Sequence, residues 1–243
     1  MPPMNLAKRT LKYVHTRAYR LAGRDPVTRR RLSRRTDVAQ IGSRYGGWSI
    51  PMDMINSESI CYCVGCGEDI SFDLGLIDGF RCEVYAFDPT PRAIRHVESH
   101  AAGNPRYHFS PVGLWDKAEK LKFYVPINPK DVSHSLLNLQ KTNDFIEVPV
   151  ERLSAIMARN GHTHLDLLKL DIEGAEYKVL DSMFADGIDV AILCVEFDEY
   201  WNALDGDWLQ RIRDYVERII GQGYAMIDAP GNGNYTFLKR ADA

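Results

Sequence analysis

The segment CYCVGCGEDIS, residues 61–71, combines a glycine turn with two acidic residues. Gly65 and Gly67 allow a tight turn, and Glu68 and Asp69 follow it directly, where we expect a helix to begin. The start of a helix attracts anions, but two carboxylates at this point repel phosphate and attract a cation. The segment therefore favours a ligand that carries positive charge, although the same acids also stabilise a helix dipole without any ligand.

Acidic residues also end two later apolar runs. Asp88 follows CEVYAF and is joined by Pro89 to a PTP turn, while Asp171 ends LDLLKLD and Glu173 comes two positions later. In open sheets of parallel strands, ligands bind outside the carboxyl ends of the strands, where the strand order reverses. We therefore expect Gly65 and Asp171 to face one crevice.

A zwitterion that carries adenosine matches this charge pattern, and S-adenosylmethionine is such a ligand. Its ammonium and sulfonium are cationic, and its ribose hydroxyls can donate to Asp88, which lies 21 residues past Gly67. Tyr45 and Trp48, in RYGGWSI, can cover the cofactor through cation–π attraction, with core packing as the alternative for Trp48. The predicted cofactor-binding residues are Gly65, Gly67, Glu68, Asp69, Asp88, Pro89 and Trp48.

Cys61, Cys63 and Cys66 raise zinc as an alternative, because thiolates are good zinc ligands. A closed structural site needs a fourth ligand, and Cys61 and Cys63 sit on an extended strand while Cys66 lies in the turn. We therefore interpret them as small buried thiols. The odd count of five cysteines is unlike a disulfide framework and favours a reducing, cytoplasmic setting.

Three motifs together resemble the FkbM family of S-adenosylmethionine-dependent methyltransferases: VGCGEDISFD, VYAFDPTP and LLKLDIEGAEYKVL. The resemblance covers roughly residues 45 to 200, and FDPTP and DIEGAE are its more specific parts. It implies a class I methyltransferase fold and methyl transfer to a hydroxyl group, often on sugars, glycolipids or polyketides. One departure is CVEFD, where many members have E-F-H and this chain has Asp198 in place of the histidine.

Methyl transfer to a hydroxyl needs a group that takes the proton, and three residues are candidates for this catalytic role. Asp171 and Glu173 can both reach the expected crevice, with capping of the next helix as their alternative role. His134 belongs to a long segment, 126–144, which we expect to form a loop over the acceptor pocket. Histidine suits a base near neutral pH.

Glu196 and Asp198 end another apolar run and add two acids to the same rim. Together with Asp171 they form a candidate oxygen-ligand site for Mg²⁺, which would make the acceptor hydroxyl more acidic. A bare carboxylate base is the alternative, and both stay open.

The elements that must position these residues alternate along the chain. Short β-rich runs and amphipathic helical segments follow one another after residue 36, which predicts an α/β fold of the Rossmann-like, class I methyltransferase type with helices on both faces. We expect about seven mostly parallel strands, including RYHFS, LKFYVP and FIEVPV in the middle of the chain. YAMID and YTFLKR flank PGNGN and predict a C-terminal antiparallel hairpin. Residues 37–243 are thus predicted to form one domain.

Residues 1–36 differ from the rest in charge, with eleven Lys and Arg against the single Asp25. This segment predicts a basic helical arm that either packs in solution or contacts an anionic membrane surface. The remainder is acidic, which argues against a nucleic-acid substrate. No uninterrupted apolar run resembles a signal peptide or a spanning helix.

Two other functions stay as alternatives to an O-methyltransferase that acts on a small-molecule or glycan hydroxyl. An NAD-dependent oxidoreductase is disfavoured because Ile70 occupies the third glycine position of G-x-G-x-x-G. A non-catalytic, membrane-associated module would use the basic arm and keep the fold as a scaffold. The sequence carries no signal for the oligomeric state.

Overall fold

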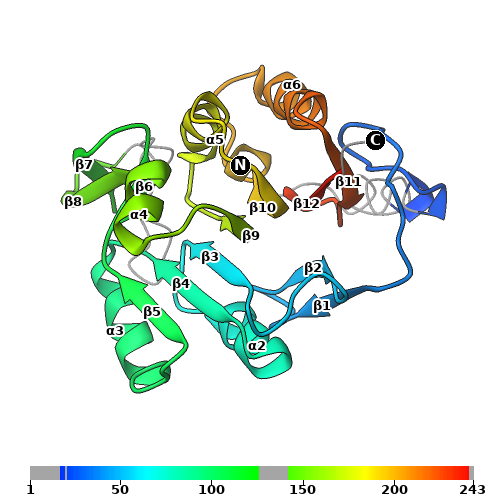
Figure 1. The fold of residues 1–243 in the computed structure, drawn as a ribbon. Coiled ribbons are helices and arrows are strands. Elements are labelled where there is room, and N and C mark those ends of the chain that lie inside the picture. Colours follow the sequence, from blue (N-terminus) through cyan, green and yellow to red (C-terminus); the bar gives the residue numbers. More distant parts are fainter. Residues whose placement is uncertain (1–16, 20, 126–141, 241–243) are drawn as a thin grey trace.

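A seven-stranded sheet forms the centre of the computed structural model, which describes residues 17–19, 21–125 and 142–240 (Figure 1). Its strand order is β11-β12-β10-β9-β3-β4-β5, and only β12 runs antiparallel to its neighbours. The strands are β3 (Ile60–Val64), β4 (Glu83–Phe87), β5 (Tyr107–Ser110), β9 (Leu165–Leu170), β10 (Val190–Glu196), β11 (Tyr224–Asp228) and β12 (Asn234–Lys239). β4 and β5 extend the sheet on one side of β3, and β9 lies on its other side. The strand order therefore reverses between β3 and β9.

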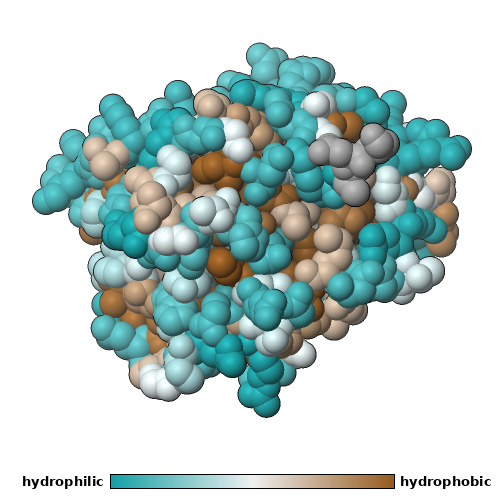
Figure 2. All heavy atoms as spheres, viewed as in Figure 1, coloured by the Kyte–Doolittle hydropathy of each residue, from teal (hydrophilic) through white to brown (hydrophobic). Residues whose placement is uncertain are grey.

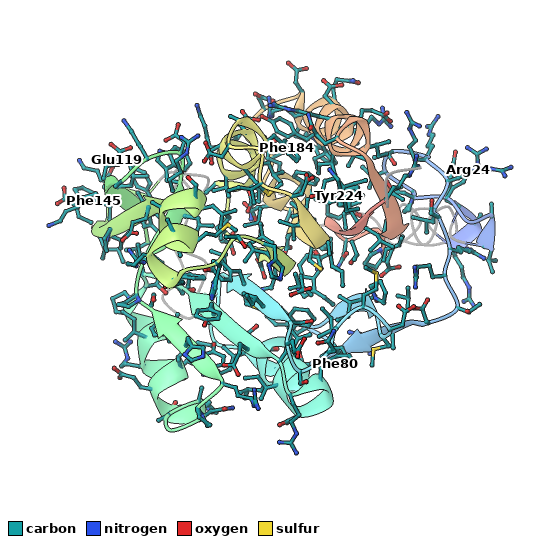
Figure 3. The ribbon with its side chains drawn as sticks, viewed as in Figure 1. Arg24, Phe80, Glu119, Phe145, Phe184 and Tyr224 are labelled. Atoms are coloured by element: carbon teal, nitrogen blue, oxygen red, sulfur yellow. The ribbon has the colours of Figure 1, made fainter. Side chains whose placement is uncertain are left out.

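Helices cover both faces of this sheet (Figure 1). One layer holds α2 (Ser71–Phe80) and α3 (Pro91–His100), and the other holds α4 (Leu153–Asn160), α5 (Glu176–Ala185) and α6 (Trp208–Gly221). Figure 3 labels Phe80, the last residue of α2, and Phe184 of α5, which pack against opposite faces of the sheet. Burial on both faces explains why the central strands are nearly continuous apolar runs.

The predicted α/β fold is confirmed, with two differences in the strands. The strands LKFYVP and FIEVPV lie outside the main sheet, in a small sheet of order β6-β8-β7, and a further hairpin precedes β3. These strands are β1 (Val38–Ile41), β2 (Trp48–Pro51), β6 (Gly113–Trp115), β7 (Glu119–Tyr124) and β8 (Phe145–Arg152). β7 and β8 bury only one face, which packs into a separate small cluster around Phe123. The C-terminal hairpin forms as expected, with β12 alone reversed.

The second half of the predicted basic arm packs onto the body of the protein. Asp25 is fully buried, and its carboxylate accepts hydrogen bonds from the backbone N–H of Thr28 at 2.7 Å and from the hydroxyl of Tyr235 at 3.4 Å. The Ser33 N–H donates to the carbonyl of Met226 in β11 at 2.8 Å. The predicted boundary at residue 36 therefore separates segments that share one core. Residues 1–16 and 20 lie outside the described residues, so membrane contact by the arm stays a prediction.

The face of the molecule in Figure 2 is largely hydrophilic, with apolar residues gathered toward its middle. Within the described ranges, no helix combines the length and the apolar character needed to cross a membrane. All five cysteines are free and buried, so the interpretation of Cys61, Cys63 and Cys66 as buried thiols is confirmed.

Candidate functional site

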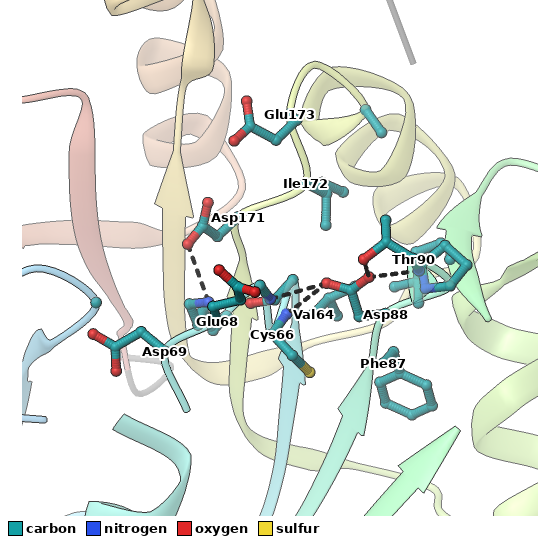
Figure 4. Close-up of a pocket in the computed structure, with 18 of the residues that line it drawn as sticks. Val64, Cys66, Glu68, Asp69, Phe87, Asp88, Thr90, Asp171, Ile172 and Glu173 are labelled. Carbon is teal, nitrogen blue, oxygen red and sulfur yellow. Dashed lines mark hydrogen bonds and ion pairs between the residues drawn. The ribbon is translucent and has the colours of Figure 1, made fainter. Parts of the chain in front are cut away.

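A pocket opens at the carboxyl ends of β3, β4 and β9, beside the point where the strand order reverses (Figure 4). It encloses about 840 Å³, including its open mouth. Eight of the predicted cofactor-binding and catalytic residues line it: Gly65, Gly67, Glu68, Asp69, Asp88, Pro89, Asp171 and Glu173. The expectation that the glycine turn and Asp171 face one crevice is confirmed.

Gly65 is the point of closest approach between the turn after β3 and the end of β9. Its φ is +88°, and a Cβ atom added there would lie 1.7 Å from the backbone oxygen of Asp171. Gly67 also has a positive φ, +50°, but a Cβ atom at that position would meet nothing within 4 Å. Close packing therefore requires glycine at 65, whereas Gly67 contributes backbone freedom alone.

Asp88 at the end of β4 holds the glycine turn in place. Its Oδ2 accepts hydrogen bonds from the backbone N–H groups of Cys66 and Gly67, both at 3.0 Å. Its Oδ1 accepts from the N–H and the hydroxyl of Thr90, at 2.9 and 2.7 Å. A carboxylate has about four acceptor positions, so all of them are engaged by the protein itself. The predicted contact with ribose hydroxyls would have to replace one of these bonds.

Asp69 ties the start of α2 to the loop that precedes β2. Its Oδ1 accepts from the N–H of Ser71 at 2.9 Å, and its Oδ2 accepts from the hydroxyl of Ser43 at 2.5 Å. The Ser43 oxygen in turn accepts from the N–H of Tyr45 at 3.0 Å. Burial opposes the charged form of Asp69, but these hydrogen bonds outweigh it and lower its pKa. Asp69 thereby fixes the loop that brings Tyr45 to the pocket.

The DIEGAE segment forms a left-handed turn between β9 and α5. Glu173 and Gly174 both have positive φ, +51° and +99°. The carboxylate of Glu176 accepts from the N–H groups of Ile172 at 3.1 Å and Gly174 at 3.0 Å, and burial is the main cause that raises its pKa to about 8. The capping role considered for Asp171 and Glu173 is thus filled by Glu176, and both remain at the pocket.

Glu196 and Asp198 lie beside Asp171 because β10 pairs with β9 in parallel. Burial, followed by the charge of Asp171 and a hydrogen bond to it, raises the pKa of Glu196 to about 10. Burial beside Asp171 thus favours the protonated form of Glu196. Asp198 is 6% exposed, its pKa is raised by burial, and its Oδ1 accepts from Asn202 at 3.1 Å.

The structure does not support the Mg²⁺ site predicted from Asp171, Glu196 and Asp198. Within residues 17–19, 21–125 and 142–240, no group of three or more His, Cys, Asp and Glu side chains could hold a metal ion. Burial favours the protonated form of Glu196, and Asp198 accepts a hydrogen bond from Asn202 through Oδ1. We therefore derive no step through a metal.

The variant Glu196→Gln is expected to stabilise the protein above about pH 5. An unfolded glutamate loses its proton near its ordinary pKa of 4.5, whereas folded Glu196 keeps it until about pH 10. The stability that this proton contributes is present below pH 4.5 and is lost as the pH rises toward 10. Glutamine stays neutral throughout, so we expect a higher Tm at pH 8. The Tm should rise by about 2–4 °C for each kcal/mol of unfolding free energy that the variant gains. The exposed Glu58→Gln is the control, and a lower Tm for Glu196→Gln at pH 8 would contradict the assignment.

Lys169 is a pocket residue that the sequence analysis did not single out. It is 4% exposed, and its Nζ donates to the carbonyl of Gly65 at 2.7 Å and pairs with the Oδ2 of Asp171 at 3.1 Å. A single lysine inside the apolar run LDLLKLD was the available signal, because a buried ammonium requires charged or polar partners.

The remaining predicted residues have different surroundings. Trp48 is 3% exposed and belongs to the core cluster that contains Phe72, so the structure places it in the core and away from the pocket lining. Tyr45 lines the pocket and is 83% exposed. His134 and most of the predicted acceptor loop lie outside the described residues, and their role stays a prediction.

Comparisons with known proteins point to one family. The Methyltransferase FkbM domain matches residues 66–219, more than half of this chain. The "Probable methyltransferase-like protein 24" of Rattus norvegicus is 26% identical over 143 residues, which cover 58% of this chain and 33% of that protein. The "Methyltransferase 1" of Beauveria bassiana is 28% identical over 142 residues, 50% of this chain and 52% of that protein. The matched region thus spans a third to a half of these relatives.

Among solved structures, methyltransferase FkbM from Methylobacillus flagellatus KT is 15% identical, with a TM-score of 0.44. The match covers 74% of this chain and 43% of that one.

Proposed function

This chain belongs to the FkbM family of S-adenosylmethionine-dependent methyltransferases, and from this premise we propose that it methylates a hydroxyl group of a sugar, glycolipid, polysaccharide or related natural product. Its sheet order, with β12 reversed, is that of the class I methyltransferase fold. The pocket lies where ligands bind in such sheets, at the reversal between β3 and β9.

The charge of the pocket is the observation that carries this proposal. Five carboxylates line it, and Lys169 is the only basic side chain among the lining residues that the structure describes. One of the five, Glu68, is paired with Arg92 at 2.7 Å. S-adenosylmethionine, with two cationic groups and one carboxylate, suits such a pocket, whereas the two phosphates of NAD would be repelled.

When bound, S-adenosylmethionine supplies an electrophilic methyl group on its sulfonium. The residues of this chain then have three tasks: to bind the cofactor, to exclude water and to accept the proton of the acceptor hydroxyl. The glycine turn and its acids serve the first task, and the buried, pocket-lining Phe87, Leu114 and Phe123 serve the second. We assign to Asp171 and Glu173, which line the pocket, the task of accepting the proton as the acceptor oxygen gains the methyl group.

Binding measurements separate this proposal from its rivals. Calorimetric titration should show binding of S-adenosylhomocysteine and no binding of NAD. Binding of NAD alone would overturn the methyltransferase proposal, and binding of neither would favour a non-catalytic module. Methyl transfer from labelled S-adenosylmethionine to a panel of sugars and glycolipids then identifies the acceptor.

The variant Asp171→Asn is expected to lower methyl transfer by about 10²- to 10⁴-fold, because a positioned base contributes about that factor. Asparagine preserves the shape of the side chain but cannot take a proton at neutral pH. The control is Asp78→Asn, which changes an exposed aspartate on α2 and should leave turnover unchanged. Full turnover of Asp171→Asn would remove Asp171 from the catalytic role and leave Glu173 and His134 as the candidates.

A further inference from the structure

Lys169 is a buried cation beneath the pocket that the chemistry proposed above does not use. It is 4% exposed and comes from β9, whose apolar side chains fill the core on both faces. Water is thus almost excluded from the ammonium, and such a charge persists only where charged and polar partners compensate for its lost hydration.

The partners of Lys169 belong to both sides of the pocket floor. Its Nζ donates to the carbonyl of Gly65, in the turn after β3, at 2.7 Å, and pairs with the Oδ2 of Asp171, at the end of β9, at 3.1 Å. Burial opposes its charged form, but the carboxylates of Asp171 and Asp73 outweigh that effect and raise its pKa above the usual range. One permanent charge therefore connects the two segments, and the dashed line at Asp171 in Figure 4 marks this ion pair.

A hydrogen bond with Glu196 and the ion pair with Lys169 are the contacts that orient the carboxylate of Asp171 among those described. Besides Lys169, the charged and titratable groups around it are Glu173, Glu196, Asp198 and the hydroxyl of Tyr45. None of these is a cation. If the ammonium were removed, repulsion within this acidic group would favour a proton on Asp171 or a different side-chain orientation.

We propose that Lys169 is a positioning residue, which holds the carboxylate of Asp171 and the glycine turn in one fixed relation. The cofactor and the proton-accepting carboxylate then meet in a single geometry, as an effective methyl transfer requires. This inference rests on the proposed function, because it assigns Lys169 a role in that same site.

A double-mutant cycle tests whether Lys169 acts through Asp171. S-adenosylhomocysteine is titrated calorimetrically into the full chain as wild type, Lys169→Met, Asp171→Asn and the double variant. We expect Lys169→Met to weaken binding by about 10- to 100-fold in the wild-type background and by much less beside Asp171→Asn. Additive effects would overturn the proposal. Lys178→Met, at an exposed position on α5, is the matched control.

Proton release on binding is a readout that a purely structural role would not change. In the wild type, the ammonium of Lys169 pairs with the carboxylate of Asp171, so we expect titrations between pH 6 and 8 in two buffers of different ionisation heat to agree. In Lys169→Met, the ammonium of S-adenosylhomocysteine should displace a proton from the acidic group, and the heats should differ. Equal heats in both proteins, together with unchanged affinity, would show that Lys169 does not position Asp171.

Two controls distinguish failure of this inference from failure of the proposed function and from unfolding of the variant. If wild type fails to bind S-adenosylhomocysteine, the proposed function falls, whereas normal binding by both wild type and Lys169→Met overturns this inference alone. If Lys169→Met unfolds because Asp73 loses its buried partner, Asp73→Asn is added to remove the uncompensated charge, and the cycle is run in that background.

Discussion

Gly65→Ala is expected to abolish binding of S-adenosylhomocysteine and to lower the stability of the protein. The new Cβ atom would lie 1.7 Å from the backbone oxygen of Asp171, so β9 and the turn after β3 must move apart. A φ of +88° strains an alanine backbone by about 1–2 kcal/mol. Forced repacking of β9 and the turn destabilises the protein by about a further 1–3 kcal/mol. At about 2–4 °C per kcal/mol, the Tm should fall by roughly 10 °C.

Gly67→Ala is the matched control, because it makes the same substitution two residues away in the same turn. Gly67 has a φ of +50°, but its Cβ position is open, so only the cost of the left-handed backbone remains. We expect a Tm loss of a few degrees and retained binding, measured by thermal unfolding and calorimetry. Equal losses in the two variants would mean that backbone strain, and not the approach to Asp171, makes Gly65 necessary.

The sequence alone does not predict this difference between the two glycines. The motif places Gly65 and Gly67 in one turn and gives them the same expected role, because spacing reports which residues permit a turn. The distance from Gly65 to Asp171 depends on how β3 and β9 pair across about a hundred intervening residues. Such a contact arises only in the folded sheet, so the spacing of residues within one motif does not predict it.

The fold itself was largely predictable for the opposite reason. Apolar runs such as LDLLKLD and DVAILCVEF are long enough and sufficiently apolar to require burial on both faces, which only a helix-covered sheet provides. β7 and β8 gave the same strand signal, yet they form a separate small sheet because each buries one face only. The Mg²⁺ prediction lacks support in the structure for a similar reason, since the spacing of acids in the sequence does not show that burial favours the protonated form of Glu196.

Asp88→Asn is expected to disorder the glycine turn even before any cofactor is added. The carboxylate accepts four hydrogen bonds, two from the N–H groups of Cys66 and Gly67 and two from Thr90. An amide offers one acceptor oxygen and presents an NH₂ donor to the other pair, so one side must lose its partner. Hydrogen bonds to a charged group contribute about 1.5–3 kcal/mol each, so losing the pair on one side should lower the unfolding free energy by about 3–6 kcal/mol.

The ligand-free protein separates this structural role from the ribose contact predicted for Asp88. Amide hydrogen exchange of Cys66 and Gly67 should accelerate in Asp88→Asn without cofactor, and affinity for S-adenosylhomocysteine should fall at least tenfold. Thr90→Val is the control, because it removes only the hydroxyl bond to Oδ1 and leaves both turn amides with Oδ2. If exchange in Asp88→Asn matches the wild type while affinity is lost, Asp88 acts on the cofactor alone. If both change together, the turn is the element through which Asp88 prepares the site.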